Sequence, residues 1–284
     1  MAPVTPPSPT SAPNRPPRMR RWVVVATTVW GLLLAGGVVW SVYRGEPTAR
    51  EQTTITDADP VTRRAVAELA RASTVDRLAV VALQAGELSE CEVSLARDGL
   101  RLQVPMLAFV AAGTEEALLQ RIAERLPDSY QAKVRTGDNP RLTADAGLWV
   151  AIIGTVIAPG QVRLVVDTGD CRPAGSDPVA LPMETVADRA TAQAVLDALS
   201  VPPQEWRSRR IACADGGVLE TVSVTTAEDA AVGPLDRALS PVTGSGTVVA
   251  TRDLVAYFSG DTGVAVRIDG TRLVVTSTDV RCGA

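Results

Sequence analysis

The feature that constrains this chain most is an apolar stretch near its N-terminus, Trp22 to Tyr43, which carries no charge over 22 residues. As a helix it would be about 33 Å long, because an α-helix rises ~1.5 Å per residue. A hydrocarbon core is roughly 30 Å thick, so this length is enough to cross a bilayer. The stretch therefore predicts a transmembrane helix whose partner is the lipid bilayer. It separates a short N-terminal tail from a long C-terminal portion.

The charges around this stretch predict its orientation. Four arginines and no acidic residue precede it: Arg15, Arg18, Arg20 and Arg21. Arginine-rich flanks stay in the cytoplasm, so we expect a single-pass cell-membrane protein with a cytoplasmic N-terminus and an extracytoplasmic C-terminal portion. A cleaved signal peptide is the alternative, but its apolar region is shorter and ends in a small-residue cleavage site, which VVWSVYRGEP does not offer.

Charge and residue types exclude several functions. The net charge is −4, and the first 43 residues contribute +4, so the remainder has 24 basic and 32 acidic residues, a net charge of −8. This balance argues against nucleic acid as a partner. The chain has no histidine, which excludes Ser-His-Asp catalysis and the usual zinc sites. We therefore expect a protein that is not an enzyme, with no metal site and no cofactor.

Composition and turn signals divide the chain into six segments. Proline-rich and polar stretches mark the tail and the linkers, whereas the two long segments alternate helical and strand periodicity. The predicted segments are a disordered tail (1–21), the transmembrane helix (22–43), a linker (44–58), a first α+β repeat (59–173), a short linker (174–180) and a second α+β repeat (181–284).

The first repeat reads helix, hairpin, helix, hairpin. Asp59 and Pro60 are typical of a helix start, so we expect a helix over about 60–72. Asp98-Gly99 predicts a hairpin turn, and Thr114 opens a second helix. The remaining expectations are a polar loop over 128–146 and strands over 148–153 and 162–166.

The second repeat shows the same order. We expect a helix over 185–199, a hairpin from strands 209–213 and 218–224, and a helix that begins at a Thr226–Asp229 capping box and is disturbed by Gly233-Pro234. Strands over 254–258, 264–268 and 273–276 close it.

The positions of the four cysteines follow this internal duplication. In each repeat one cysteine lies on the first hairpin and the other just past the last strand. Four cysteines allow three pairings, and the duplication selects Cys91–Cys171 and Cys213–Cys282. An oxidising outer compartment would maintain such bonds. A zinc site built from all four cysteines is the alternative, although no C-x-x-C pair is present.

Two Asp-Thr-Gly triplets, at Asp167 and Asp261, resemble the paired triplets of aspartic proteases. The internal alignment places Asp167 opposite Thr276, not opposite Asp261, which instead sits in a predicted turn. Turn chemistry is therefore the preferred interpretation. A hydrolase that uses Asp167 or Asp170 as a carboxylate remains an alternative hypothesis.

Glu205 to Arg210 (EWRSRR) is a basic patch whose arginines suit carboxylates or phosphates, unless they are simply solvated. The layout is similar to that of bacterial envelope scaffold and division proteins. The sequence thus predicts a non-catalytic interaction module for other envelope proteins. A small-ligand sensor is the alternative, and it would require a concave pocket with Arg207, Arg209 or Arg210 on its wall.

Overall fold

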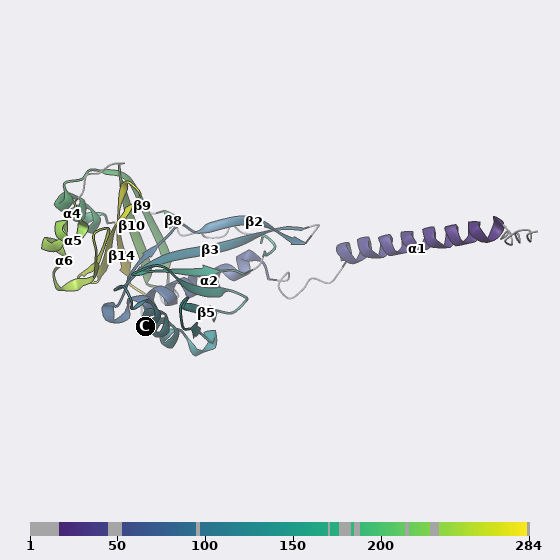
Figure 1. The fold of residues 1–284 in the computed structure, drawn as a ribbon, viewed down its shortest axis with the longest axis horizontal. Coiled ribbons are helices and arrows are strands. Elements are labelled where there is room, and N and C mark those ends of the chain that lie inside the picture. Colours follow the sequence, from purple (N-terminus) through teal and green to yellow (C-terminus); the bar gives the residue numbers. More distant parts are fainter. Residues whose placement is uncertain are drawn as a thin grey trace, which may run out of the picture. The chain divides into compact units, whose positions relative to one another are not determined.

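The computed structural model describes residues 17–44, 53–94, 97–169, 171–175, 183–184, 188–213, 216–227 and 233–282 (Figure 1). The chain forms two compact units, Met1–Pro47 and Thr48–Ala284. Most of the predicted tail, part of the 44–58 linker and most of the 174–180 linker lie outside the described residues.

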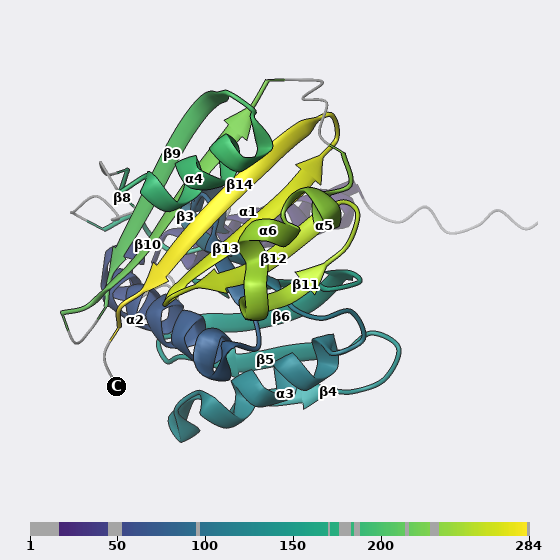
Figure 2. The ribbon, with the colours of Figure 1, turned by 90° about the vertical axis from the view of Figure 1, so that its left-hand side faces the viewer.

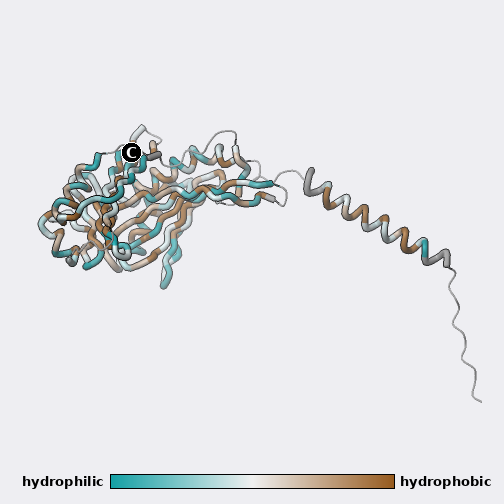
Figure 3. Tube along the Cα trace, turned by 90° about the horizontal axis from the view of Figure 1, so that it is seen from above, coloured by the Kyte–Doolittle hydropathy of each residue, from teal (hydrophilic) through white to brown (hydrophobic). Residues whose placement is uncertain are grey.

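The first unit contains one long helix, α1 (Pro17–Arg44). Its segment Arg21–Trp40 is long and apolar enough to cross a membrane, a test that a signal sequence near the N-terminus also meets. None of the side chains of Arg21–Trp40 is buried, and Figure 3 shows hydrophobic residues along most of this segment. The helix includes the predicted span and begins earlier, so residues 17–21 are helical and not part of a disordered tail.

The second unit opens with helix α2 (Ile55–Thr74), which starts earlier than predicted. Its N-cap is Thr54, not Asp59. The Thr54 hydroxyl accepts a hydrogen bond from Asp57 N at 3.2 Å, and the Asp57 carboxylate accepts one from Thr54 N at 3.0 Å. This reciprocal capping box satisfies two backbone donors that a helix start leaves open. Pro60 therefore lies inside the helix, and residues 55–58 are not linker.

The rest of the first half forms a seven-stranded antiparallel sheet, the first sheet, and a second helix. Helix α3 begins after Thr114, as predicted. The elements are β1 (Val80–Leu83), β2 (Glu87–Ser94), β3 (Arg97–Phe109), α3 (Glu115–Arg125), β4 (Lys133–Arg135), β5 (Arg141–Asp145), β6 (Ala151–Ala158) and β7 (Gln161–Asp167), with 3-10 turns at Val75–Arg77 and Asp128–Tyr130.

The second half forms another seven-stranded antiparallel sheet, the second sheet, with shorter helices. Its elements are β8 (Met183–Glu184), α4 (Ala190–Leu199), β9 (Pro203–Ala212), β10 (Val218–Thr226), α5 (Leu235–Ala238), α6 (Ser240–Thr243), β11 (Thr247–Ala250), β12 (Leu254–Ser259), β13 (Thr262–Asp269) and β14 (Arg272–Val280), with a 3-10 turn at Gly244–Gly246.

Both sheets share one strand order. It runs β2-β3-β7-β6-β5-β4 in the first sheet and β9-β10-β14-β13-β12-β11 in the second. The disulfides are Cys91–Cys171 and Cys213–Cys282, which is the predicted pairing. Each ties the first strand of this order to the chain just past its third strand. Because the cysteines are oxidised, the alternative zinc site is not formed.

Several local predictions were wrong. The stretch predicted as a polar loop contains the β4–β5 hairpin. Leu148 and Trp149 are not in a strand, because both have left-handed backbone angles, with φ of +50° and +62°. One helix was expected from Thr226 onward, but Thr226 is the last residue of β10, and the residues described from 233 on form the two short helices α5 and α6; Asp229 lies outside the described residues. Strand β11 was not predicted.

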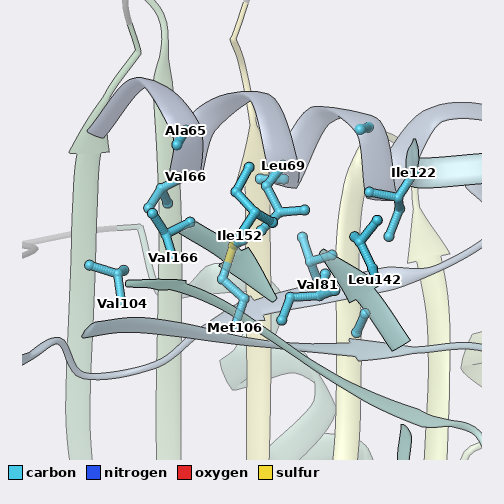
Figure 4. Packing of buried hydrophobic residues seen from close by; sticks show 14 of the residues in the cluster. Ala65, Val66, Leu69, Val81, Val104, Met106, Ile122, Leu142, Ile152 and Val166 are labelled. Atoms are coloured by element: carbon cyan, nitrogen blue, oxygen red, sulfur yellow. The ribbon is translucent and has the colours of Figure 1, made fainter. Parts of the chain in front are cut away.

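Three apolar clusters hold the second unit together. The largest lies under α2 and α3 against the first sheet, and it also contains Ile211 and Leu219 of the second sheet (Figure 4). A second lies between α4, α5 and one face of the second sheet (Figure 2). The third joins β1 and β3 to β11, β12 and β13. The two sheets therefore share core residues.

Candidate functional site

A cavity lined by charged side chains lies between the two sheets. We call it the arginine cleft. It measures about 660 Å³. Its floor is the face of the second sheet that points away from α4 and α5, and one wall comes from β1 and β3. The lining residues are Ala82, Gln84, Leu107, Phe109, Glu205, Arg207, Arg209, Ser223, Thr225, Arg267, Asp269, Gly270, Thr271, Arg272, Val274 and Thr276.

Strand alternation decides which side chains reach this floor. Residues that face each other across antiparallel strands share a face. Arg207 lies opposite Ser223, and Arg209 lies opposite Thr221. Their neighbour Trp206 points to the other face, where it packs against the cluster beneath α4. The alternation of EWRSRR therefore places the two β9 arginines, Arg207 and Arg209, on the cleft side.

A second pair of arginines comes from the β13–β14 hairpin. Arg267 lies opposite Val274, and Arg272 lies opposite Asp269. Val274 in turn lies opposite Thr225 of β10, so all these positions share the face of Arg207. The Asp269-Gly270 turn joins the strands and brings the two hairpin arginines, Arg267 and Arg272, to one end of the cleft.

Arginines outnumber carboxylates in the lining of the cleft, although the portion of the chain after the apolar stretch is acidic. The lining holds four arginines and two carboxylates, Glu205 and Asp269. Arg207 pairs with Glu205 at 2.6 Å, and Arg267 pairs with Asp269 at 2.8 Å. The side chains of the first pair are about half exposed (53% and 54%). Exposed ion pairs contribute little stability, so an anionic ligand can compete for these guanidinium groups.

The centre of the floor is uncharged and held by hydroxyl contacts. Thr221 Oγ1 lies 2.9 Å from Thr278 Oγ1, and Ser223 Oγ lies 3.4 Å from Thr276 Oγ1. Leu83 N of β1 donates to Thr221 Oγ1 at 3.3 Å, which ties the wall strand to the floor. The first two contacts join neighbouring strands of the floor, and the third joins the two sheets.

The opposite wall is largely apolar. Ala82, Leu107 and Phe109 lie on the face of β1 and β3 that meets the second sheet. The Gln84 side chain donates to the Ala82 carbonyl at 3.2 Å. A few polar groups facing an apolar wall are typical of a ligand site, and the cleft volume falls in the range of such sites.

The structure brings two of the three sequence-predicted arginines to the cleft. Arg207 and Arg209 line it, whereas Arg210 lies on the opposite face of β9. Arg267 and Arg272, which also line the cleft, were not predicted from the sequence. Strand alternation on either side of the Asp269-Gly270 turn could have predicted that these two side chains share one face of their hairpin. It could not have predicted that this face lies in one sheet with the arginines of β9.

The carboxylates considered for a hydrolase are not gathered into a site. Asp167 is buried and accepts hydrogen bonds from Arg101 Nε at 3.0 Å, from Arg101 Nη2, from Gln103 Nε2 at 2.6 Å and from Gly169 N. This carboxylate raises the pKa of Arg101, chiefly through the side-chain hydrogen bond. Asp261 is exposed and pairs with Arg77 at 3.1 Å. Asp170 lies outside the described residues.

Other candidate sites offer less chemistry. Among the described residues, no group of three or more His, Cys, Asp or Glu side chains could hold a metal ion. A cavity of about 350 Å³ beside α4 is lined by uncharged residues such as Val195 and Tyr257. A cavity of about 200 Å³ is lined by Arg77 and Asp261, which form an ion pair with each other.

Comparison with known proteins gave one structural match. No family model and no curated protein matches the chain. A crystal structure of a DUF4853 family protein from Actinomyces odontolyticus ATCC 17982 is similar, with a TM-score of 0.35 and 12% identity over 44% of this chain and 72% of that chain.

Together, the apolar N-terminal helix and the two disulfides indicate a secreted or membrane-anchored extracytoplasmic α+β protein.

Proposed function

We propose that this chain is a single-pass protein of a bacterial cell membrane with a cytoplasmic N-terminus. The arginines before the apolar helix support this orientation, and the disulfides support an oxidising compartment for the C-terminal portion. Protease protection in intact cells tests it: an epitope at the C-terminus should be digested, and one at the N-terminus should be protected. Release of the whole C-terminal portion into the medium would instead support a cleaved signal peptide.

We propose further that the C-terminal portion is a non-catalytic interaction module that binds an anionic group in the arginine cleft. The observation that carries this proposal is the cleft itself, with four arginines on a hydroxyl-lined floor. Guanidinium groups bind carboxylates and phosphates through paired hydrogen bonds. The anionic group belongs to an envelope partner, in keeping with a scaffold role.

A small-ligand sensor is the second candidate. The cleft volume favours it, because about 660 Å³ suits a small molecule. A carboxylate hydrolase has less support, since the Asp167 oxygens already accept four hydrogen bonds.

The two halves are, in our proposal, copies of one ancestral α+β repeat. Their common strand order and equivalent disulfides support this. In both halves the order is helix, hairpin, helix and two hairpins, one hairpin more than the sequence analysis predicted.

The experiment that tests the binding proposal compares arginines on the two faces of β9. Proximity labelling from the C-terminal portion of the native chain should give a reproducible set of envelope neighbours. Arg207→Gln should deplete that set, and Arg210→Gln should leave it unchanged, because only Arg207 lines the cleft. If the two variants and a control that contains only the N-terminal helix label the same set of proteins, the proposed site is refuted. If the labelled neighbours are lost only when a soluble anion is added, the small-ligand sensor is favoured.

A further inference from the structure

We infer that the two outer strands of the first sheet, β2 and β4, pair with each other between copies of this chain, so that the sheets of successive copies join edge to edge. The partner is therefore a second copy of the chain. The contact is separate from the arginine cleft, because neither strand lines that cleft.

Both strands are edges of the first sheet. Among the described strands, β2 pairs only with β3, and β4 pairs only with β5. No further backbone–backbone hydrogen bond of the described residues involves Glu87–Ser94 or Lys133–Arg135. An edge strand presents N–H and C=O groups that point away from its own sheet, and a strand of another chain can pair with them. Each edge can therefore take one further strand.

The two edges carry opposite charges. Their charged side chains are all exposed, namely Glu87, Glu90 and Glu92 on β2 and Lys133 and Arg135 on β4. None of these five side chains forms an ion pair with another described residue. Pairing of β2 with β2, or of β4 with β4, would place like charges together, which is destabilising, whereas β4 beside β2 places opposite charges together. The charges therefore select one of three possible pairings.

Strand direction also suits this pairing. Each neighbouring pair in the order β2-β3-β7-β6-β5-β4 is antiparallel, and the order contains six strands, so β2 and β4 run in opposite directions. A second copy placed beside the first by translation presents its β2 antiparallel to β4, with the same face of the sheet on the same side. The antiparallel ladder therefore continues across the contact.

The register of the sheet puts the opposite charges on one face. Lys133 and Arg135 point away from the largest apolar cluster, because Val134 between them packs against that cluster. The registers of β5, β6, β7 and β3 place Glu87 on the same face as the two basic residues. When Arg135 lies opposite Glu87 of the second copy, Lys133 lies opposite Ser89 and diagonal to the same glutamate, within reach of a long side chain.

The same register covers an exposed leucine on the other face. Leu88 is 40% exposed, although it lies opposite the buried Leu102 of β3. When Arg135 lies opposite Glu87, Val134 lies opposite Leu88. Two apolar side chains then meet on one face of the ladder, and opposite charges meet on the other. All three residues of β4 are thus matched by β2 of the second copy.

A contact of this kind does not close on itself. It uses different surfaces on the two partners, so every added copy leaves one β2 edge and one β4 edge open. The contact therefore builds an open row of copies, each with its own arginine cleft. Because β4 has only three residues, the ladder is short, and rows form only at high local concentration.

The test is sedimentation of the full chain in detergent micelles over a concentration series up to about 100 µM. The unaltered chain should form dimers and larger species as its concentration rises. Glu87→Arg and Arg135→Glu should each weaken this association at least about tenfold, because each places like charges opposite one another. The double variant Glu87→Arg, Arg135→Glu should associate again, because the exchanged charges attract. This recovery excludes misfolding as the cause of the loss.

Arg163→Glu is the matched control. Arg163 is exposed on the same face of the sheet, but it lies on β7 in the sheet interior, so its reversal should leave the association unchanged. A loss as large as that of Arg135→Glu would mean that the basic face binds as a whole, and it would overturn the edge pairing. A chain that stays monomeric over the whole series, or association that survives both single reversals, would also overturn it.

Discussion

Removal of the Cys91–Cys171 disulfide tests whether the two halves unfold together. We consider the double variant Cys91→Ala, Cys171→Ala in a fragment of residues 48–284, which contains all three apolar clusters and both disulfides. The bond closes a loop with a sequence separation of 80. The chain-entropy relation then gives a loss of about 4.5 kcal/mol in the free energy of unfolding.

The shared core predicts that this loss is felt in both sheets. Ile211 and Leu219 of the second sheet pack in the cluster of α2 and the first sheet. The β1 strand packs against the second sheet, and Leu83 N bonds Thr221. Separating the halves would expose both sets of contacts, so we expect one cooperative transition.

The assay follows two tryptophans, since the fragment contains only Trp149 in the first half and Trp206 in the second. In urea the fluorescence of both should change at one midpoint. The disulfide variant should lower that midpoint by about 1.5 M, for an m value of about 3 kcal/mol/M. Single-tryptophan versions, Trp149→Phe and Trp206→Phe, separate the two signals.

The contradicting result is a shift of the Trp149 transition alone. It would mean that residues 59–173 and 181–284 are independent domains. The control variant Cys213→Ala, Cys282→Ala should cost at least as much as the first, because Cys213 is buried and Cys282 packs against the largest cluster, so packing is lost as well.

Three further variants test the contacts of single residues. Burial alone would raise the pKa of Glu115, but hydrogen bonds from the backbone N–H groups of Gly160, Glu115 and Gly113 outweigh burial and lower the pKa. The ionised carboxylate therefore stabilises the folded state above the ordinary glutamate pKa, and this stability is lost as the pH falls through the pKa of the folded state. Glu115→Gln should therefore be less stable at neutral pH and should show a smaller loss on acidification, and equal pH profiles of unfolding would contradict this. Asp167→Ala removes the carboxylate that pairs with Arg101. Because the Arg101 side chain is 44% exposed, we expect the free energy of unfolding in chemical denaturation to fall by only about 2–3 kcal/mol. A change below about 0.5 kcal/mol would exclude a structural role for Asp167. Leu69→Ala removes a fully buried side chain beneath α2 and should cost about 2–5 kcal/mol by the same assay, with exposed Leu78→Ala as the near-neutral control.

Local sequence signals determined much of this protein. The apolar stretch, the start of α3 at Thr114 and the Asp269-Gly270 turn each depend on chemistry within a few residues, and the structure has them where predicted. The turn predicted at Asp98-Gly99 was wrong, because both residues lie within β3 and pair with Glu92 and Cys91 of β2. The cysteine pairing was also accessible, because the repeated order of elements selected one of three pairings.

Where predictions were wrong, contacts that the local pattern did not reveal decided the structure. The reciprocal hydrogen bonds of Thr54 and Asp57 start α2 before the Pro60 signal. Within the predicted loop, residues 133–135 and 141–145 form strands because they pair with each other and β5 also pairs with β6. Leu148 and Trp149 lie in a loop in which Arg172 donates to the Leu148 carbonyl, and of these partners Arg172 is the most distant in sequence.

The candidate site was decided by the packing of one sheet on the other. Alternation placed Arg207 and Arg209 on one face of β9, and it could also have placed Arg267 and Arg272 on one face of their hairpin. Only the strand order β9-β10-β14-β13 sets these pairs at opposite ends of one floor, and only the contact of β1 and β3 with that floor closes it into a cleft. The sequence determines which side chains share a strand face. Pairing between distant strands, which depends on the whole core, determines what that face meets.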